Sequence, residues 1–144
     1  VSGGGETSNY LVSANYFETL GVPLLAGRAF DSRDTPESTR VAIVSETFVK
    51  TFYPNGDALG HRVRLRDQSG PIVEIIGISR DYATLSVGER PRPVIHFAAS
   101  QRPANAYSVL ARTSGDSTAL TQGIERELRA LEPEVVFLEL GTLA

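Results

Sequence analysis

The sequence predicts an α+β domain, in which a mixed, mostly antiparallel sheet packs with about three helices, including a β-α-β unit near the C-terminus. Three observations support this class. Short apolar runs rich in β-branched residues are bounded by glycine, proline and polar clusters, which is typical of strands. Apolar residues at helical spacing follow serine or aspartate and precede glycine or proline, as helices do between their caps. The chain has 144 residues, which is the size of one domain.

The N-terminal residues 1–8 are predicted to be a flexible tail, because they begin with the small and polar run Val1-Ser2-Gly3-Gly4-Gly5. A phosphate-binding loop would need a following Gly-Lys-Ser/Thr and a preceding strand, and the run has neither. We expect one domain over residues 9–144. The chain contains no methionine, and we therefore expect it to be a piece excised from a larger protein.

The first half of the domain is predicted to alternate strands with short helices. Residues 9–12 form a strand, and Ser13 is placed to cap a helix that ends at Gly21 and Pro23. The pair Leu24-Leu25 is expected in the core, and residues 31–38 form a polar loop. Residues 40–44 form a second strand, after which Ser45 caps a helix that ends before a proline.

The central part is predicted to be a β-hairpin. Side chains alternate between apolar and basic over residues 61–66, and a polar loop over residues 67–70 separates them from the apolar run 72–78. The second strand is almost continuously apolar, so we expect it to be central and covered on both faces. A loop with two prolines follows over residues 82–93, and residues 94–98 form the next strand.

The C-terminal part is predicted to be the β-α-β unit. Residues 107–112 alternate as a strand does, and Asp116 or Ser117 caps the longest helix, which runs to about Leu131. Residues 135–138 form the last predicted strand. The apolar stripe of this helix consists of Leu120, Ile124, Leu128 and Leu131.

Composition excludes several classes of function. The net charge of −3 gives no basic face for nucleic acid. The absence of cysteine excludes disulfides, thiolate catalysis and cysteine-ligated metal. No stretch approaches the roughly 20 apolar residues of a membrane-spanning helix, and the N-terminus lacks the basic and apolar regions of a signal peptide.

Three sets of residues are candidates for reactive or metal-binding groups. The pair His61 and His96 lacks a third zinc ligand, which favours positions at the surface or at a sheet edge. Ser45 lies between a strand and a helix, but Ile43 and Thr47 occupy the positions where a nucleophile elbow has glycine, which favours capping. The third set is Asp31, Asp34 and Glu37. Their spacing is too wide for a calcium-binding loop, which favours a solvated loop. We predict no catalytic residue, no metal and no cofactor.

Two basic segments are candidate contact surfaces. The row Arg62, Arg64 and Arg66 could receive an anionic partner, but the acidic Glu74 of the opposing strand favours a solvated edge. The prolines stiffen the segment around Arg90 and Arg92, which follows Tyr82 in the same loop. These last three residues, Tyr82, Arg90 and Arg92, are the predicted contacts with a partner.

An ordered series of short phrases spans residues 9–143. In sequence order they are Val12-Ser13-x-x-Tyr16-Phe17-x-x-Leu20-Gly21-Val22-Pro23-Leu24-Leu25-x-Gly27-Arg28-x-Phe30, Val41-Ala42-Ile43-Val44-Ser45-Glu46-Thr47-Phe48, Phe52-Tyr53-Pro54, Asp57-x-Leu59-Gly60-x-Arg62-Val63, Val73-Glu74-Ile75-Ile76-Gly77-Ile78, Pro91-Arg92-Pro93, Arg112-Thr113-x-Gly115-Asp116 and Leu128-Arg129-x-Leu131-x-Pro133. The series resembles the extracytoplasmic core domain of MacB/FtsX-type ABC transporter permeases.

The resemblance implies a periplasmic domain of a bacterial cytoplasmic membrane protein, which couples the motion of transmembrane helices to a partner or substrate outside the membrane. It implies that ATP is hydrolysed in a separate cytoplasmic domain or subunit, so this domain would not be an enzyme. The implied partners are the rest of the permease, its ATPase, and a periplasmic adaptor or substrate protein. The parent would be dimeric.

Two other classes of function stay open at this point. An extracytoplasmic ligand-binding or sensor domain of a membrane receptor would need a preformed, mostly apolar pocket with converging polar groups. A hydrolase would need a base beside a nucleophile, and the sequence offers two histidines as candidates.

Overall fold

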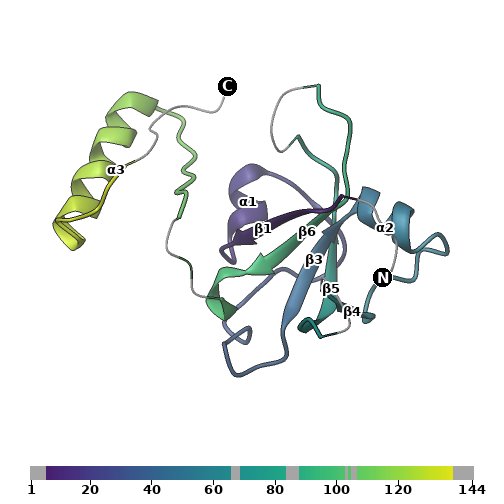
Figure 1. The fold of residues 1–144 in the computed structure, drawn as a ribbon. Coiled ribbons are helices and arrows are strands. Elements are labelled where there is room, and N and C mark those ends of the chain that lie inside the picture. Colours follow the sequence, from purple (N-terminus) through teal and green to yellow (C-terminus); the bar gives the residue numbers. More distant parts are fainter. Residues whose placement is uncertain (1–5, 66–68, 84–87, 103, 105–106, 138–144) are drawn as a thin grey trace. The chain divides into compact units, whose positions relative to one another are not determined.

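The computed structural model describes residues 6–65, 69–83, 88–102, 104 and 107–137. The chain divides into two compact units, Val1–Leu110 and Ala111–Ala144. The first contains the sheet and the second contains the longest helix (Figure 1). Among the described residues, no helix combines the length and the apolar character that crossing a bilayer requires.

The described part of the first unit forms six strands, two α-helices and a 3₁₀ turn. In chain order these elements are β1 (Ser8–Val12), α1 (Tyr16–Leu20), β2 (Leu24–Gly27), β3 (Val41–Ser45), α2 (Glu46–Phe52), β4 (Arg62–Arg64), β5 (Ile72–Ser79), β6 (Val94–Ala98) and η1 (Ala99–Gln101).

The strands form one mixed sheet in the order β1-β6-β3-β5-β2, with β4 paired to β5. The pairs β1–β6 and β3–β5 are parallel, and the pairs β2–β5, β3–β6 and β4–β5 are antiparallel. The mixed, mostly antiparallel sheet is therefore confirmed. So is the predicted hairpin, because Val63 of β4 pairs with Val73 of β5.

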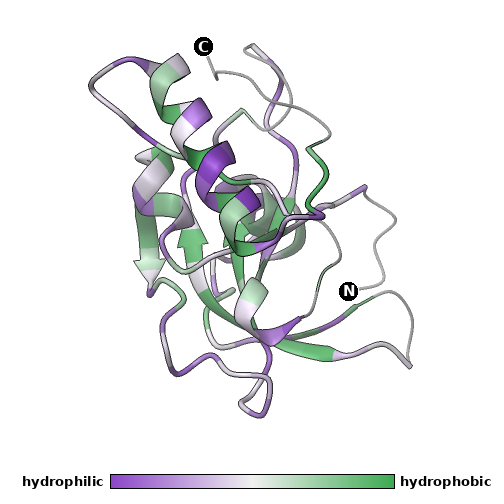
Figure 2. Cartoon of the chain, turned by 90° about the vertical axis from the view of Figure 1, so that its left-hand side faces the viewer, coloured by the Kyte–Doolittle hydropathy of each residue, from purple (hydrophilic) through white to green (hydrophobic). Residues whose placement is uncertain are grey.

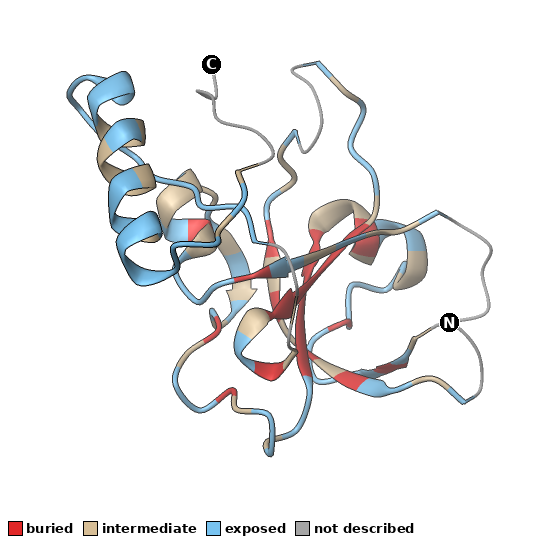
Figure 3. Ribbon diagram, turned by 60° about the vertical axis from the view of Figure 1, so that its left-hand side comes forward, coloured by how far each residue is buried: buried red, intermediate tan, exposed pale blue. Residues whose placement is uncertain are grey.

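The two short helices cover opposite faces of the sheet, because side chains alternate between the faces along each strand. On one face Ala42 and Val44 pack with Phe48 of α2. On the other face Ile43 packs with Phe17 of α1. Strands β3 and β6 are buried along their whole length, as Figure 3 shows in red, and they carry the apolar centre visible in Figure 2.

The start of α1 differs from the prediction. Asn15, rather than Ser13, is the N-cap, and no side chain caps the helix. The Ser13 hydroxyl instead donates to the Asn15 side-chain oxygen at 2.8 Å. The predicted end of α1 is confirmed. Gly21 adopts a φ of 68°, in the left-handed region. Its N–H donates to the carbonyl oxygen of Glu18, and the N–H of Val22 donates to that of Phe17.

Strand β2 is less buried than predicted, because it lies at the edge of the sheet. Leu24 is partly buried and packs against the core, but Leu25 is 46% exposed, so the expectation that both leucines lie in the core is wrong. A strand with alternating faces exposes every second side chain unless a layer covers it.

The second unit contains α3 (Ser117–Leu131), which confirms the predicted helix and its cap. The Asp116 carboxylate accepts the N–H of Thr118 at 2.9 Å, and Glu125 pairs with Arg129 at 3.0 Å. The predicted strands on either side are not formed: residues 107–112 and 135–137 have no regular secondary structure, and residue 138 lies outside the described residues. Alternation of side chains makes a segment suitable for a strand, but a strand needs a neighbour for its backbone hydrogen bonds.

A crossover between parallel strands does occur elsewhere in the chain. The parallel strands β3 and β5 are joined by a connection that contains α2 and β4. Helix α2 begins directly at the end of β3 and packs on the sheet face that the connection spans. One of the two parallel pairs of the sheet, β3–β5, therefore comes from the centre of the sequence.

Candidate functional site

The loop between β5 and β6 carries the three residues predicted to contact a partner. Arg90 is exposed, and Arg92 is exposed beside Glu89, whose carboxylate lies 3.1 Å from its guanidinium. Tyr82 is only partly exposed, and its hydroxyl points inward to other side chains rather than to solvent. The structure therefore places the two arginines at the surface, while Tyr82 belongs to a separate polar cluster.

Both ends of this loop are tied to the start of α2. At the first end, the Asp81 carboxylate accepts the N–H of Thr47 at 2.9 Å and its hydroxyl at 2.7 Å. At the second end, the Ser45 hydroxyl oxygen accepts the N–H of Val94 at 3.0 Å and the N–H of Phe48 at 3.2 Å. The carboxylate also complements the positive N-terminal end of the helix. These bonds fix both roots of the loop on the sheet.

The polar cluster is a chain of hydrogen bonds from the buried centre of the sheet towards its cover. His96 in β6 has no exposed surface, and its Nδ1–H donates to the carbonyl oxygen of Ile43 in β3 at 3.0 Å. Because Nδ1 carries the proton, Nε2 is an acceptor, and the Tyr82 hydroxyl donates to it at 2.7 Å. The Tyr82 oxygen in turn accepts from the Tyr16 hydroxyl of α1 at 2.9 Å.

Aromatic rings enclose this chain. The ring of Phe17 meets the imidazole edge-on with 4.8 Å between centroids, and the rings of Tyr10 and Tyr82 stack on it at 6.1 Å and 5.8 Å. Burial lowers the pKa of His96 to about 4, against the smaller opposing effect of its bond to Ile43. Burial also raises the pKa of Tyr82 and of Tyr16, so both hydroxyls keep their protons at neutral pH.

The prediction that both histidines lie at the surface or at a sheet edge is wrong for one of them. His61 is exposed just before β4, as expected. His96 is fully buried, because β6 lies between β1 and β3 and its face is covered by α1. Within the described ranges, no group of three or more histidine, aspartate or glutamate side chains is placed to hold a metal ion.

The acidic loop after β2 is organised by an ion pair. The guanidinium of Arg28 binds both carboxylate oxygens of Asp34, each at 2.9 Å, and Asp34 is buried. This hydrogen bond from Arg28 is the main reason that the pKa of Asp34 is lowered. Hydrogen bonds from Arg33 lower the pKa of Asp31 in the same way. The expectation of a wholly solvated loop is therefore wrong for Asp34, which is part of the structure's interior.

The basic row on β4 is partly neutralised, as the sequence suggested. Arg62 lies 3.9 Å from the carboxylate of Glu74 on the paired strand. Arg64 donates to the carbonyl oxygen of Gly70 at 3.1 Å. The third residue of the row, Arg66, lies outside the described residues.

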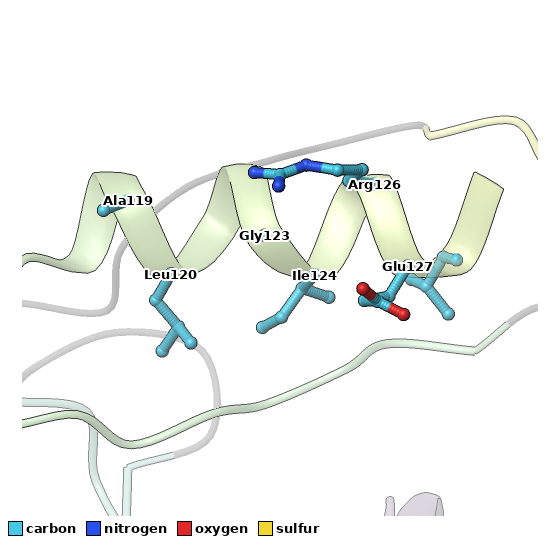
Figure 4. A pocket seen from close by; sticks show the side chains of 7 residues that line it. Ala119, Leu120, Gly123, Ile124, Arg126 and Glu127 are labelled. Carbon is cyan, nitrogen blue, oxygen red and sulfur yellow. The ribbon is translucent and has the colours of Figure 1, made fainter. Parts of the chain in front are cut away.

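A shallow hollow in the second unit has lining residues that, among those the structure describes, all belong to α3, as Figure 4 shows. Its apolar members Leu120, Ile124 and Leu128 belong to the predicted stripe, and none of them is buried. A sensor domain needs polar groups that converge from several elements on one cavity. This hollow does not have that arrangement, so it does not favour the sensor hypothesis.

Sequence reasoning missed the chain of Tyr16, Tyr82 and His96. One signal was available. His96 lies in the run Val94–Ala98, and the other four residues of this run are all apolar. A polar residue in such a run is usually buried and hydrogen-bonded to a partner. The identity of the partner was not available, because Tyr16 and Tyr82 are distant in the sequence and meet only through the fold.

Comparison with known proteins identifies relatives. A family model described as the MacB-like periplasmic core domain matches residues 1–129. The macrolide export ATP-binding/permease protein MacB of Neisseria gonorrhoeae is 22% identical over 130 residues, which is 85% of this chain and 20% of that protein. The protein of the same name from Neisseria meningitidis serogroup A gives the same values. The chain therefore spans about a fifth of these relatives.

The fold also occurs in a solved structure. The periplasmic region of MacB from Actinobacillus actinomycetemcomitans superimposes with a TM-score of 0.63 at 20% identity, covering 85% of this chain and 56% of that one. The mixed sheet with its helices is thus a known architecture.

Proposed function

Since this chain belongs to the family of MacB-like periplasmic core domains, we propose that it is the extracytoplasmic domain of an ABC-type transporter permease in a bacterial cytoplasmic membrane. The observation that carries the proposal is the family match over residues 1–129, which includes the whole sheet. ATP is hydrolysed in a separate cytoplasmic domain or subunit, and this domain has no catalytic role of its own.

The proposed role is mechanical coupling. The domain passes the movement of transmembrane helices to a partner or substrate outside the membrane. Support comes from the sheet, whose central strands β3 and β6 are buried along their whole length between two helical layers. Close-packed interiors deform little, so a force applied at one edge of such a sheet moves the whole unit.

The proposed contact surface is the loop between β5 and β6, with Arg90 and Arg92 as the contacting side chains and Tyr82 as the residue that holds the start of the loop. The bonds of Asp81 to Thr47 and of Val94 to Ser45 support this assignment, because they hold both ends of the loop that carries the arginines. The partners are the rest of the permease with its ATPase and a periplasmic adaptor or substrate protein, in a dimeric assembly.

Distances between spin labels test this role in the full-length permease reconstituted with its ATPase. The present chain contains no cysteine, so Arg90→Cys and Arg62→Cys place a label at each of two exposed sites of the domain. Between the nucleotide-free and the ATP-bound states, we expect the Arg90–Arg90 distance across the dimer to change. The Arg62–Arg90 distance within one domain is expected to stay constant.

A constant Arg90–Arg90 distance across the ATP cycle would contradict the coupling role. A changing distance within the domain would contradict the rigid-body mechanism. Alanine variants of Arg90 and Arg92 then test the contact surface. The measurement is substrate-coupled ATP hydrolysis, and Arg64→Ala on the distant strand β4 is the matched control.

A further inference from the structure

We propose that the buried hydrogen-bond chain of Tyr16, Tyr82 and His96 is an acid-sensitive latch that holds α1 and the start of the β5–β6 loop on the sheet. In the closed state the imidazole is neutral and the two hydroxyls form a lid over it. In the acid state the imidazole carries a proton, and the lid opens to admit water. This inference goes beyond the proposed function and does not depend on it.

The geometry joins three separate elements through one ring. His96 belongs to a central strand, Tyr82 to the loop that follows β5, and Tyr16 to the first turn of α1. The two bonds that link them measure 2.7 Å and 2.9 Å. Any event that breaks the bond at the imidazole therefore loosens the hold of the sheet on Tyr82 and on Tyr16 of α1 together, while Asp81 still ties the root of the loop to α2.

The direction of each bond in the chain is determined. The carbonyl oxygen of Ile43 can only accept, so it fixes the proton of His96 on Nδ1 and leaves Nε2 as the acceptor. A second proton on Nε2 makes this atom a donor, and the Tyr82 hydroxyl must then turn its own proton towards Tyr16. The Tyr16 hydroxyl must in turn donate to a group outside the chain. Protonation therefore reverses every bond of the lid.

Among the residues that the structure describes, none that faces the ring offers a counter-charge to its protonated form. The groups that face it are Tyr10 from β1, Tyr16 from α1, Tyr82 from the loop and the carbonyl of Ile43 from β3. None of these is a carboxylate. An imidazolium without an anionic partner needs water, because burial penalises the charged form. The lowered pKa of His96 agrees with this surrounding.

Helix α1 is the part of the cover that can give way. It has five residues and no side-chain cap at its N-terminus, whereas Ser45 caps α2 with its side chain. An isolated helix of this length is unstable in water, so α1 depends on its contacts with the sheet. Its contacts on the ring are the side chains of Tyr16 and Phe17. Water reaches the ring when these two side chains lift.

Imidazole ¹⁵N resonances of the 144-residue chain test the protonation step. The chain has two histidines, and His61→Gln leaves the imidazole signals of His96 alone in the spectrum. At neutral pH, His96 is expected to show the tautomer with the proton on Nδ1, and to take up its second proton only near pH 4. A titration midpoint of His96 near the ordinary imidazole pKa of about 6.5, or a proton on Nε2 at neutral pH, would overturn the latch.

Hydrogen exchange of backbone amides tests the opening step. After correction for intrinsic rates, we expect the amides of α1 to lose at least tenfold protection between pH 7 and pH 4, while those of β3 stay protected. The same loss is expected in the control His61→Gln. Simultaneous loss in α1 and β3 would show global unfolding and would overturn the proposal, as would unchanged protection of α1.

Two variants test whether the chain of bonds is responsible. Tyr82→Phe keeps the ring and removes the hydroxyl, so we expect α1 to lose about tenfold protection already at pH 7. His96→Phe keeps an aromatic ring and removes the titrating group, so the protection of α1 is expected to be independent of pH. If His96→Phe does not fold, Tyr82→Phe decides: full protection of α1 at pH 7 in that variant contradicts the latch.

Discussion

Gly27 of β2 and Gly77 of β5 are register partners whose backbones lie too close together for either to carry a side chain. A Cβ atom at Gly27 would lie 2.1 Å from the carbonyl oxygen of Ile76, and one at Gly77 would lie 2.7 Å from that of Arg28. Gly27 also has a φ of 77°, in the left-handed region that favours glycine. The edge strand is thereby drawn tightly onto the sheet.

Gly27→Ala is expected to lower the free energy of unfolding by more than about 3 kcal/mol, because it adds a steric clash with backbone to an unfavourable φ. Gly56 has the same φ of 77° with open space around it, and Gly56→Ala is the matched control. The control should cost about 1 kcal/mol. Urea denaturation measures both, and equal losses would show that the close contact does not matter.

Ser45→Ala is expected to lower the free energy of unfolding by about 2 kcal/mol, because it leaves the N–H groups of Phe48 and Val94 without their acceptor. Ser13→Ala is the control, since Ser13 caps no helix and is exposed. We expect a change below about 0.5 kcal/mol for it. A larger loss of stability in Ser13→Ala than in Ser45→Ala would contradict the assignment of Ser45 as a cap and of Ser13 as no cap.

Asp34→Asn is expected to cost about 2 kcal/mol, because the neutral amide replaces a buried carboxylate that binds Arg28 at two points. The effect should disappear in acid. The pKa of Asp34 is lowered in the folded state, so its contribution is complete above the unfolded pKa and is lost as the pH falls through the folded pKa. The exposed pair of Glu46 and Lys50 is the control, and Glu46→Gln should leave stability unchanged.

The stability of the protein is expected to fall between about pH 6.5 and pH 4 by ~1.4 kcal/mol per pH unit from His96 alone. The sign follows from the lowered pKa of about 4: in this window the unfolded chain binds a proton that the folded chain does not. Denaturation of the parent chain at several pH values, compared with His96→Phe, isolates the contribution. Parallel curves for the two proteins would contradict it.

Local patterns in the sequence were sufficient for most of the first unit. The alternation over residues 61–66 and the apolar run that follows predicted the β4–β5 hairpin, and Gly21 predicted the end of α1. Each of these features depends on neighbouring residues or on one turn. The family resemblance then supplied the overall architecture, with which the mixed six-stranded sheet agrees.

Features that depend on distant residues could not be predicted. The burial of His96 follows from the position of β6 between β1 and β3, and the strand order is not a local property. Arg28 and Asp34 are only six positions apart, but the loop that buries Asp34 is held by a distant residue, because the Ser100 hydroxyl donates to the Asp34 carbonyl oxygen. For residues 107–112, the local pattern predicted a strand that the fold does not form. The pattern suits a strand, but none of the described residues pairs with them.

The parallel register of Ser8 with Val94 joins the first strand of the chain to the last strand of the sheet. During synthesis, β1 has no partner strand until β6 has been made, which is near the end of the first unit. Closing so long a loop costs entropy before any contact offsets it, so we expect β1 to dock late and the folding of this unit to be slow. A waiting strand is also open to mispairing with another nascent chain, which makes β1 the place where aggregation of this domain would begin.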